Sequence, residues 1–291
     1  MKQFIAFDIG GTHIKYGIVR EDGSVAASFL DDTEAHLGGP SIVKKLIHLS
    51  REMLKSYEAD GVAVSTAGRV DAEKGIVLGE SNNIPGYKGM ELKQLISKEL
   101  NLPVKVRNDA ECAALCEQWL GDHGAENFLM LTVGTGVGGG IIINNQLYSG
   151  HSFSAGEWGY MRIEGEQFEK VASFPGLIRM AKEYKGGGEW TGKTIFDLYD
   201  QGDQEIGKAV STFYKHLAIG ISNLLYVFDP EKVVIGGGIA LRGDIFLKDI
   251  KEEVKKYAVE SFYNRTEIVL AKHQNHSGMI GAVYHFTQER D

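Results

Sequence analysis

The sequence predicts an α/β protein built from two related lobes that face each other across a cleft. Two observations lead to this prediction. A β-rich run, a turn of Gly and Thr, and a second β-rich run occur near the N-terminus and again about 124 residues later. Segments of strand character also alternate with segments whose apolar residues recur at helical spacing. The chain has 291 residues, of which 43% are hydrophobic, and this is enough for two lobes with substantial cores.

The first lobe is expected to begin with a ladder of antiparallel hairpins. Residues 3–9 and 14–19 are β-rich and are joined through Gly10-Gly11-Thr12, and a third apolar run follows at 25–30. Apolar residues then recur at helical spacing over 43–57. The first hundred residues therefore combine antiparallel hairpins with helical crossovers.

The second lobe is expected to repeat this opening. A strand over 128–133 leads into the glycine-rich turn 134–140, and the chain leaves the turn as a second strand. A long helix over 203–228 and a short strand over 233–235 follow, and the strand ends in Gly236-Gly237-Gly238.

The start of the repeat places the lobe boundary near residue 119. We therefore expect residues 1–118 to form the N-terminal lobe and residues 119–275 the C-terminal lobe. A C-terminal helix over 276–291 is expected to pack back on the N-terminal lobe. No low-complexity linker separates the halves.

Composition excludes several classes of protein. The net charge of −8 is a poor match for the phosphate backbone of nucleic acid. The longest uncharged apolar run, 128–143, contains five glycines and is shorter than the roughly 18–20 residues of a spanning helix. Asp8 lies too close to the N-terminus for a signal peptide, and two cysteines, Cys112 and Cys116, favour a reducing compartment. We expect a soluble cytoplasmic protein without membrane or nucleic-acid partners.

The glycines of the two turns indicate phosphate binding. The spacing of Gly134, Gly136 and Gly139 fits the dinucleotide fingerprint, but a strand follows where that fingerprint needs a helix. A turn of Gly and Thr can instead offer its backbone N–H groups to an anion, and two such turns would clamp one polyphosphate.

Charged residues beside the first turn indicate a cation at the same place. Asp8 precedes the glycines, and Thr12 and Lys15 follow them. A carboxylate beside bound phosphate implies an intervening Mg²⁺, held by Asp8 directly or through water, while Lys15 offsets phosphate charge. A plain hairpin turn with a solvated Asp8 is the alternative.

Five motifs occur in order along nearly the whole chain. They are Asp8–Gly17, Asn108-Asp109, Gly134–Gly140, Gly156–Gly159 and Gly236–Gly238. Together they resemble the ROK (repressor, open reading frame, kinase) family of sugar kinases. The resemblance implies the two-lobed actin-like ATPase (ribonuclease H-like) fold and transfer of the ATP γ-phosphoryl group to a sugar hydroxyl, usually at C6, with ATP and Mg²⁺ as cofactors. The implied nucleotide contacts are Asp8, Gly10, Gly11, Thr12, Lys15, Gly134, Thr135, Gly136, Gly237 and Gly238.

Asp109 is the candidate catalytic base. It lies at a strand-to-helix junction, between the apolar run 104–106 and the helical stretch 110–120. From spacing alone, Asn108 or Asp109 could equally cap that helix. The resemblance favours catalysis, because in the family this Asn-Asp pair contacts the sugar and the Asp is the base.

The resemblance implies further contacts with the sugar. Asn83 belongs to an Asn-Ile-Pro-Gly-Tyr segment similar to a turn of the family, and Glu157 would accept hydrogen bonds from ring hydroxyls. The alternatives are an ordinary Pro85-Gly86 turn and solvated charges at Arg69 and Glu157. The complete set of candidate sugar contacts is Gly68, Arg69, Asn83, Asn108, Asp109, Glu157 and Tyr160.

Two departures from the family pattern affect the sugar pocket. Tyr160 stands where the family usually has His, and the cysteine-rich zinc loop that follows is missing, so we expect no zinc site. The Glu that ends that loop is expected to be missing with it. We predict a more open, apolar pocket in which Tyr160 and Trp158 offer stacking surfaces. Such a pocket favours a β-glucoside, and N-acetylmannosamine and glucose are the alternatives.

Other functions within the family are less consistent with this sequence. Its repressors carry a DNA-binding winged helix before the kinase-like body, whereas here the first strand begins by residue 3. A non-catalytic sugar-binding or regulatory protein is a distant alternative, because Asp8, Asp109 and Glu157 are all present. Related kinases are often dimers, so analogy gives a homodimer as the default.

Overall fold

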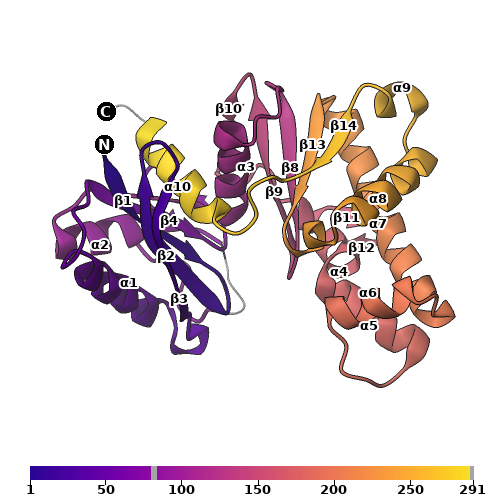
Figure 1. Ribbon diagram of the computed structural model, residues 1–291, viewed down its shortest axis with the longest axis horizontal. Helices are drawn as coiled ribbons and strands as arrows, with labels where there is room; N and C mark the ends of the chain where they lie inside the picture. The colour runs from indigo at the N-terminus through magenta and orange to yellow at the C-terminus, as the bar shows by residue number, and fades with distance from the viewer. Residues whose placement is uncertain (80–83, 289–291) are drawn as a thin grey trace. The chain divides into compact units, whose positions relative to one another are not determined.

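The computed structural model describes residues 1–79 and 84–288 of the chain. They form two compact units, each assembled from separate stretches of sequence (Figure 1). Segments 119–124 and 147–155 lie on the C-terminal side of the expected boundary but belong to the first unit. The first unit is Met1–Gly124, Leu147–Ala155 and Lys272–Asp291, and the second is Ala125–Gln146 and Gly156–Ala271.

A five-stranded mixed sheet forms the centre of the first unit. Its strands, in the spatial order β3-β2-β1-β4-β7, are β1 (Gln3–Ile9), β2 (His13–Arg20), β3 (Val25–Asp32), β4 (Gly61–Thr66) and β7 (Val104–Asn108). Strands β1, β2 and β3 pair antiparallel, which confirms the predicted hairpin ladder, and β4 and β7 add to it in parallel. The other elements are η1 (Ala35–Leu37), α1 (Gly39–Met53), β5 (Val70–Asp71), β6 (Ile76–Val77), α2 (Leu92–Leu100), α3 (Asp109–Leu120) and α10 (Ser277–Gln288).

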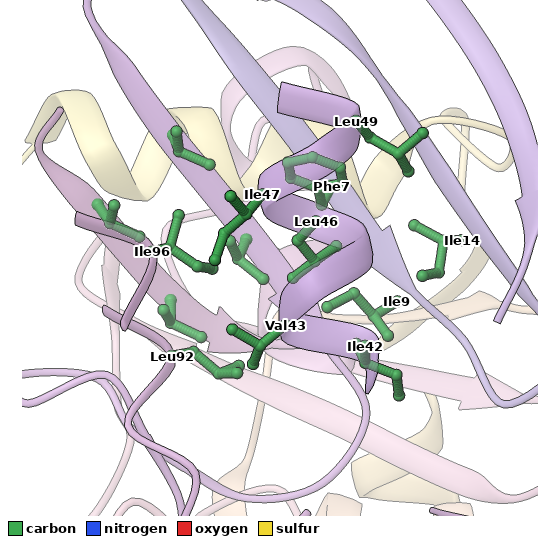
Figure 2. Packing of buried hydrophobic residues seen from close by; sticks show 14 of the residues in the cluster. Phe7, Ile9, Ile14, Ile42, Val43, Leu46, Ile47, Leu49, Leu92 and Ile96 are labelled. Atoms are coloured by element: carbon green, nitrogen blue, oxygen red, sulfur yellow. The ribbon is translucent and has the colours of Figure 1, made fainter. Parts of the chain in front are cut away.

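Side chains alternate between the two faces of β1, so this sheet has a core on each side. Ile5, Phe7 and Ile9 lie on one face, where buried residues of α1 and α2 pack against them (Figure 2). Phe4 and Ala6 lie on the other face and share a core with α3 and α10. Each fully buried side chain of this size contributes about 1.5–3 kcal/mol. The end of β1 that carries Asp8 is therefore fixed from both sides.

The second unit contains a sheet of the same topology. Its strands, in the order β10-β9-β8-β13-β14, are β8 (Phe128–Val133), β9 (Val137–Ile143), β10 (Gln146–Leu147), β13 (Lys232–Gly236) and β14 (Glu267–Leu270). Strands β8 and β9 are antiparallel, and β13 and β14 add in parallel. Strand β8 thus takes the place of β1 and β13 the place of β4. The shared order confirms that the two Gly/Thr turns are equivalent parts of a repeat.

Helices and short hairpins complete the second unit. The long helix predicted over 203–228 is present as α7, and the Asp203 side chain caps it by accepting from the backbone N–H groups of Glu205 and Ile206. In the part of the chain that the structure describes, no helix is both long enough and apolar enough to span a bilayer. The elements are η2 (Trp158–Tyr160), β11 (Arg162–Ile163), β12 (Glu166–Gln167), α4 (Phe168–Ala172), α5 (Phe174–Lys185), α6 (Gly192–Asp200), α7 (Gln204–Phe228), η3 (Gly238–Arg242), α8 (Asp244–Tyr257) and α9 (Glu260–Tyr263).

Candidate active site

Asp8 lies at the end of β1, next to the first glycine turn. Asp8 pairs with Lys15 of the neighbouring strand β2 and with Ser65 of the neighbouring strand β4. The Ser65 hydroxyl donates a hydrogen bond to Asp8 Oδ1 at 2.8 Å. Burial raises the pKa of the Asp8 carboxyl, while the hydrogen bond from Ser65 and the charge of Lys15 lower it. A partly buried carboxylate of this kind is stabilised in its ionised form by added positive charge.

The start of helix α10 packs directly against Asp8. A Cβ added at Gly278 would lie 2.4 Å from Asp8 Oδ1, so any larger residue would displace the carboxylate. Lys15 Nζ donates to the Asn275 carbonyl at 3.0 Å, and the Lys15 charge, together with burial, lowers the pKa of His276. This group cannot be identified from the sequence, because its members come from opposite ends of the chain and share no local motif.

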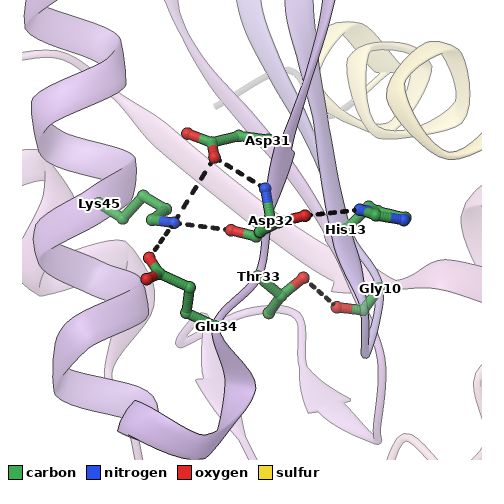
Figure 3. A network of polar contacts seen from close by, with 7 residues as sticks. All are labelled: Gly10, His13, Asp31, Asp32, Thr33, Glu34 and Lys45. Carbon is green, nitrogen blue, oxygen red and sulfur yellow. Dashed lines mark hydrogen bonds and ion pairs between the residues drawn. The ribbon is translucent and has the colours of Figure 1, made fainter.

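A polar network behind the first turn holds its backbone in place (Figure 3). The Thr33 hydroxyl donates to the Gly10 carbonyl at 2.7 Å, and the Thr33 N–H donates to the Thr12 carbonyl at 2.8 Å. Gly11 and Thr12 themselves stay exposed. Lys45 of α1 fixes the chain around Thr33 through the Asp32 carbonyl and the carboxylates of Asp31 and Glu34. The turn therefore offers an ordered backbone to solvent.

Asn108 is the helix cap that spacing alone could not tell from Asp109. Asn108 caps helix α3, since its Oδ1 accepts from the N–H groups of Ala110 at 2.9 Å and Glu111 at 3.0 Å. Asp109 Oδ1 accepts from Asn108 Nδ2 at 3.0 Å and from the Ala110 N–H at 2.9 Å. Asn108 Nδ2 also donates to the Gly68 carbonyl at 3.0 Å. The capping residue thus orients the neighbouring carboxylate.

A buried hydroxyl pair lies near Asp109. The Tyr87 hydroxyl and Thr66 Oγ1 are 2.6 Å apart and share a hydrogen bond. Burial raises the pKa of Tyr87, and the charge of Asp109 raises it further, which places the Asp109 carboxylate within electrostatic reach of this pair. Asn83, which the sequence predicts as a sugar contact, lies outside the described residues.

The two other predicted sugar contacts of the first unit lie next to Asn108. Gly68 has a left-handed backbone, with φ of 87°, and presents its carbonyl to Asn108. Arg69 follows it and donates from Nη1 to Ser154 Oγ at 2.9 Å. Arg69 therefore has a protein partner and is not simply a solvated charge.

The second glycine turn, in the second unit, has little side-chain bulk around it. The Gly134 N–H donates to the Gly136 carbonyl at 3.0 Å, and the Gly134 carbonyl accepts from the Phe174 N–H at 2.8 Å. Thr135 is exposed at the tip of the turn. The strand that follows is β9, as the sequence predicts, which excludes the dinucleotide-binding arrangement.

Glycine is required at the adjacent end of β13. Gly237 has φ of 81°, and a Cβ there would lie 2.6 Å from the Val133 carbonyl oxygen. A Cβ at Gly238 would lie 2.7 Å from the Phe174 ring. The backbone of β13 thus lies against the end of β8 at a distance that only glycine permits.

The structure corrects one of the predicted stacking surfaces. Trp158 is only 6% exposed, donates from Nε1 to the Met130 carbonyl at 3.1 Å and packs edge-on against Phe228. It belongs to the core of the second unit, where its indole N–H has the hydrogen-bond partner that a buried Trp needs. Tyr160 is 62% exposed, and Glu157 is half-buried.

A carboxylate of helix α4 lies beside the second glycine turn. Glu169, in helix α4, has Oε2 2.9 Å from the position of a Cβ on Gly136 and 3.3 Å from that of a Cβ on Gly159. An acidic side chain therefore lies beside both the second turn and the Gly156–Gly159 element. The Gln-Phe-Glu-Lys segment has no pattern that marks this Glu, so only the packing of α4 identifies it.

A short hairpin follows Tyr160, in the segment where the sequence leads us to expect no zinc loop. Strands β11 and β12 pair, and Glu164 in their turn forms ion pairs with Lys215 at 2.6 Å and His216 at 3.2 Å, both on α7. Within residues 1–79 and 84–288, no three His, Cys, Asp or Glu side chains gather as a metal site. The cysteines are buried free thiols on α3.

The predicted site residues fall into two groups, one in each unit. The first unit holds the predicted base, the predicted magnesium-binding carboxyl and most of the predicted sugar contacts, namely Asp8, Gly10, Gly11, Thr12, Lys15, Gly68, Arg69, Asn108 and Asp109. The second unit holds Gly134, Thr135, Gly136, Glu157, Tyr160, Gly237 and Gly238. Chemically, the first group includes several acidic and basic side chains, and the second offers mainly backbone N–H groups.

Comparison with known proteins extends these observations. A model of the ROK family matches residues 4–289. A beta-glucoside kinase from Listeria monocytogenes is 35% identical over 297 residues, covering 98% of this chain and 98% of the relative. A solved ROK family glucokinase from Streptomyces griseus, in complex with glucose and AMPPNP, is 28% identical with a TM-score of 0.84, covering 97% of this chain and 98% of that one. A ROK family protein from Streptococcus pneumoniae, in complex with sucrose, is 27% identical with a TM-score of 0.87 and covers 98% of both chains.

Proposed function

Since the chain belongs to the ROK family of sugar kinases, we propose that it transfers the γ-phosphoryl group of ATP to the C6 hydroxyl of a β-glucoside. Family membership makes it a sugar phosphotransferase with the actin-like ATPase fold, as the sequence predicts. The observation that supports the catalytic assignment is Asp109, a carboxylate fixed by two hydrogen bonds at the first residue of α3.

Asp109 acts as the general base in this proposal. Phosphoryl transfer to a hydroxyl needs a group that accepts the hydroxyl proton and holds the oxygen in line. Asn108 and the Ala110 N–H fix Asp109 Oδ1, so the carboxylate is oriented before the sugar binds. Asn108 also links it to the Gly68 carbonyl, next to the proposed sugar contact Arg69. This arrangement supplies the positioning on which phosphoryl transfer mainly depends.

The two glycine turns bind the nucleotide in this proposal. The Gly134–Gly136 turn, whose Thr135 is exposed, offers the Thr135 and Gly136 N–H groups to phosphate, and Gly237-Gly238 lies beside the adenosine. The first turn and Lys15 bind phosphate oxygens from the first unit. Asp8 suits Mg²⁺, which prefers one or two carboxylates together with phosphate and water oxygens. When bound, the ion offsets the charge that develops on the phosphate oxygens.

The choice of a β-glucoside is supported by sequence similarity and by the acceptor side of the site. The Listeria relative is named a beta-glucoside kinase, and the Streptococcus pneumoniae relative holds a disaccharide, sucrose. Tyr160 is exposed beside Glu157 and provides an apolar surface for an aglycone. Glucose and N-acetylmannosamine are the alternative acceptors, and glucose is bound by the Streptomyces griseus relative.

A substrate panel tests this proposal. ADP release is measured with ATP and Mg²⁺ against phenyl β-glucoside, cellobiose, glucose and N-acetylmannosamine, with a reaction lacking sugar as the control for hydrolysis. We expect kcat/KM to be highest for the two β-glucosides. A clear preference for either free monosaccharide would contradict the substrate assignment, and the absence of phosphorylation of any of the four would contradict C6 kinase activity on these acceptors.

A further inference from the structure

Residues 149–154 form a loop that two arginines of the first unit hold by hydrogen bonds. We call it the clasped loop. It lies between β10 and the Gly156–Gly159 element, within the stretch 147–155 that returns to the first unit. The Ala155 N–H donates to the Ser149 carbonyl at 3.1 Å and closes the loop at its base. The loop therefore leads directly into the element that carries Glu157.

Two arginines fasten the ends of the clasped loop. Arg107 Nη1 donates to Ser149 Oγ at 2.9 Å, and its side chain is only 10% exposed and forms an ion pair with Glu111 at 3.0 Å. Arg69 Nη1 donates to Ser154 Oγ at 2.9 Å. Charge-assisted hydrogen bonds of this kind are stronger and more directional than neutral ones. Each end of the loop is thus fixed by a guanidinium group.

These arginines flank the proposed catalytic pair. Arg107 immediately precedes Asn108 in β7, and Arg69 follows Gly68, whose carbonyl accepts from Asn108 Nδ2. The clasped loop is therefore hydrogen-bonded to the residue before Asn108 and to the residue after Gly68. These bonds anchor the loop next to the residues that hold the Asp109 carboxylate.

Phe153 is the large apolar side chain of the clasped loop. Its backbone has φ of 53°, a conformation that is rare for a bulky residue and tends to occur at functional sites. The other non-glycine residues with positive φ in the described chain are Asn, Asp or Glu, namely Glu34, Asn101, Asp122, Asn144, Asn145, Glu164 and Asp229. The side chain is half-buried, and among the described residues its ring makes no aromatic pair. Packing with another ring therefore does not account for the strained backbone.

We propose that Phe153 is a specificity-determining residue, whose ring stacks on the aglycone of the acceptor glycoside. This inference rests on the proposed function and extends it, because it assigns the preference for aromatic or apolar aglycones to one residue. Asp109 acts on C6 and the aglycone is attached at C1, so the two groups contact different parts of the same acceptor. The hydrogen bonds from Arg69 and Arg107 fix the loop that carries the ring, which reduces the conformational entropy that the loop loses when the acceptor binds.

The test compares phenyl β-glucoside with glucose in wild type and Phe153→Asn. Asn adopts positive φ readily, so the variant removes the ring and keeps the loop backbone, and we expect an unchanged Tm. KM for phenyl β-glucoside is expected to rise about tenfold, because an aromatic contact is lost. KM for glucose and kcat for both sugars are expected to stay within about twofold, since glucose has no aglycone to contact. Tyr148→Ala, which removes an exposed ring just before the loop, is the matched control and is expected to change neither KM.

Other outcomes separate this inference from the proposed function. If wild type prefers β-glucosides and Phe153→Asn changes both KM values equally or neither, Phe153 has no role in specificity and the proposed function stands. If wild type phosphorylates no β-glucoside, both the inference and the proposed substrate fail.

Ser149→Ala combined with Ser154→Ala provides a second test that retains the ring. Its expected result is an intermediate rise in KM for phenyl β-glucoside alone, and an unchanged value would contradict positioning by the arginines. Phe153→Leu, which keeps apolar bulk, replaces Phe153→Asn if that variant does not fold.

Discussion

The two glycine turns occupy equivalent places in equivalent sheets, yet their surroundings are chemically opposite. Asp8 stands two residues before the first turn and faces Ser65 on the neighbouring parallel strand. At the same place in the second unit, Thr132 stands two residues before the turn and faces Gly236. The first position thus has a carboxyl group with a hydrogen-bond donor, and the second has a hydroxyl group opposite a residue without a side chain.

The same contrast extends through the two units. In the described part of the chain, the buried Arg, Asp, Glu and Lys residues are Arg107, Glu111 and Glu117, all in the first unit. The buried polar residues of the second unit are neutral hydroxyls and a histidine, namely Ser173, His216, Ser222 and Thr266. Under the proposed function, the first unit supplies charged groups for the reaction and the second supplies backbone N–H groups to the phosphates.

Removing the charge beside the first turn is expected to have the largest effect. Asp8→Asn keeps the size and the hydrogen bond from Ser65 but removes the carboxylate that suits Mg²⁺. We expect kcat to fall about 10³-fold, roughly 4 kcal/mol, with partial recovery at high Mg²⁺. ADP release across a Mg²⁺ titration measures this. Thr132→Val at the equivalent place is the control and should keep kcat, whereas an equal loss in both variants would remove the distinction between the turns.

Adding a methyl group at Gly237, next to the second turn, is expected to have the next largest effect. Gly237→Ala places a Cβ 2.6 Å from the Val133 carbonyl oxygen at φ of 81°. We expect the free energy of unfolding to fall by about 3 kcal/mol, because strain and steric clash add. Gly207→Ala in α7 is the matched control, since a Cβ there meets nothing within 4 Å, and it should stabilise by about 0.5–1 kcal/mol. Urea denaturation compares them, and equal effects would show that close approach does not explain Gly237.

The buried charge of Glu117 should make the first unit sensitive to acid. Glu117 accepts hydrogen bonds from the N–H groups of Lys272 and His273 and from His123 Nε2. These contacts lower the pKa of Glu117 below its ordinary value of 4.5, although burial opposes them. A lowered pKa stabilises the fold above the unfolded-state pKa, and this stability is lost as the pH falls through the folded-state pKa.

Glu117→Gln should therefore cost about 2 kcal/mol above pH 5 and progressively less below pH 4.5. Urea denaturation between pH 3 and pH 7 provides the measurement. A difference between wild type and variant that does not change over this range would mean that the Glu117 charge does not stabilise the first unit.

Loss of the hydroxyl that holds Asp8 is expected to have the smallest effect. Ser65→Ala removes one hydrogen bond of 2.8 Å to the carboxylate and leaves its charge. We expect kcat/KM to fall about fivefold, or roughly 1 kcal/mol. Steady-state kinetics at saturating Mg²⁺ measures the change. A loss as large as that of Asp8→Asn would mean that orientation of the carboxylate, rather than its charge, is what matters.

The local elements of this protein could be predicted from sequence because their signals are local. The strand over 128–133 has the predicted bounds, since a β-rich run is followed there by turn residues. The two turns were recognised for the same reason. Within the candidate site, Asn108-Asp109 could be placed at a strand-to-helix junction, but spacing could not show which of the two caps helix α3.

Contacts between distant segments could not be predicted. The return of residues 147–155 to the first unit depends on hydrogen bonds from Arg107 and Arg69, 42 and 85 positions away in sequence. The burial of Trp158 and the position of Glu169 depend on how η2 and α4 pack in the second unit. No residue pattern near these positions specifies such packing, so the acceptor side of the site required the structure.

The activity of Asp109→Asn tests the central assignment most directly. The substitution keeps the shape of the side chain and its place at the start of α3, but removes the carboxylate that accepts the hydroxyl proton. We predict a fall in kcat of about 10²–10⁴-fold in ADP release with phenyl β-glucoside, with the dissociation constant of the sugar changed by less than about threefold in calorimetry. An unchanged kcat would show that Asp109 is only a neighbour of the helix cap and that another group accepts the proton.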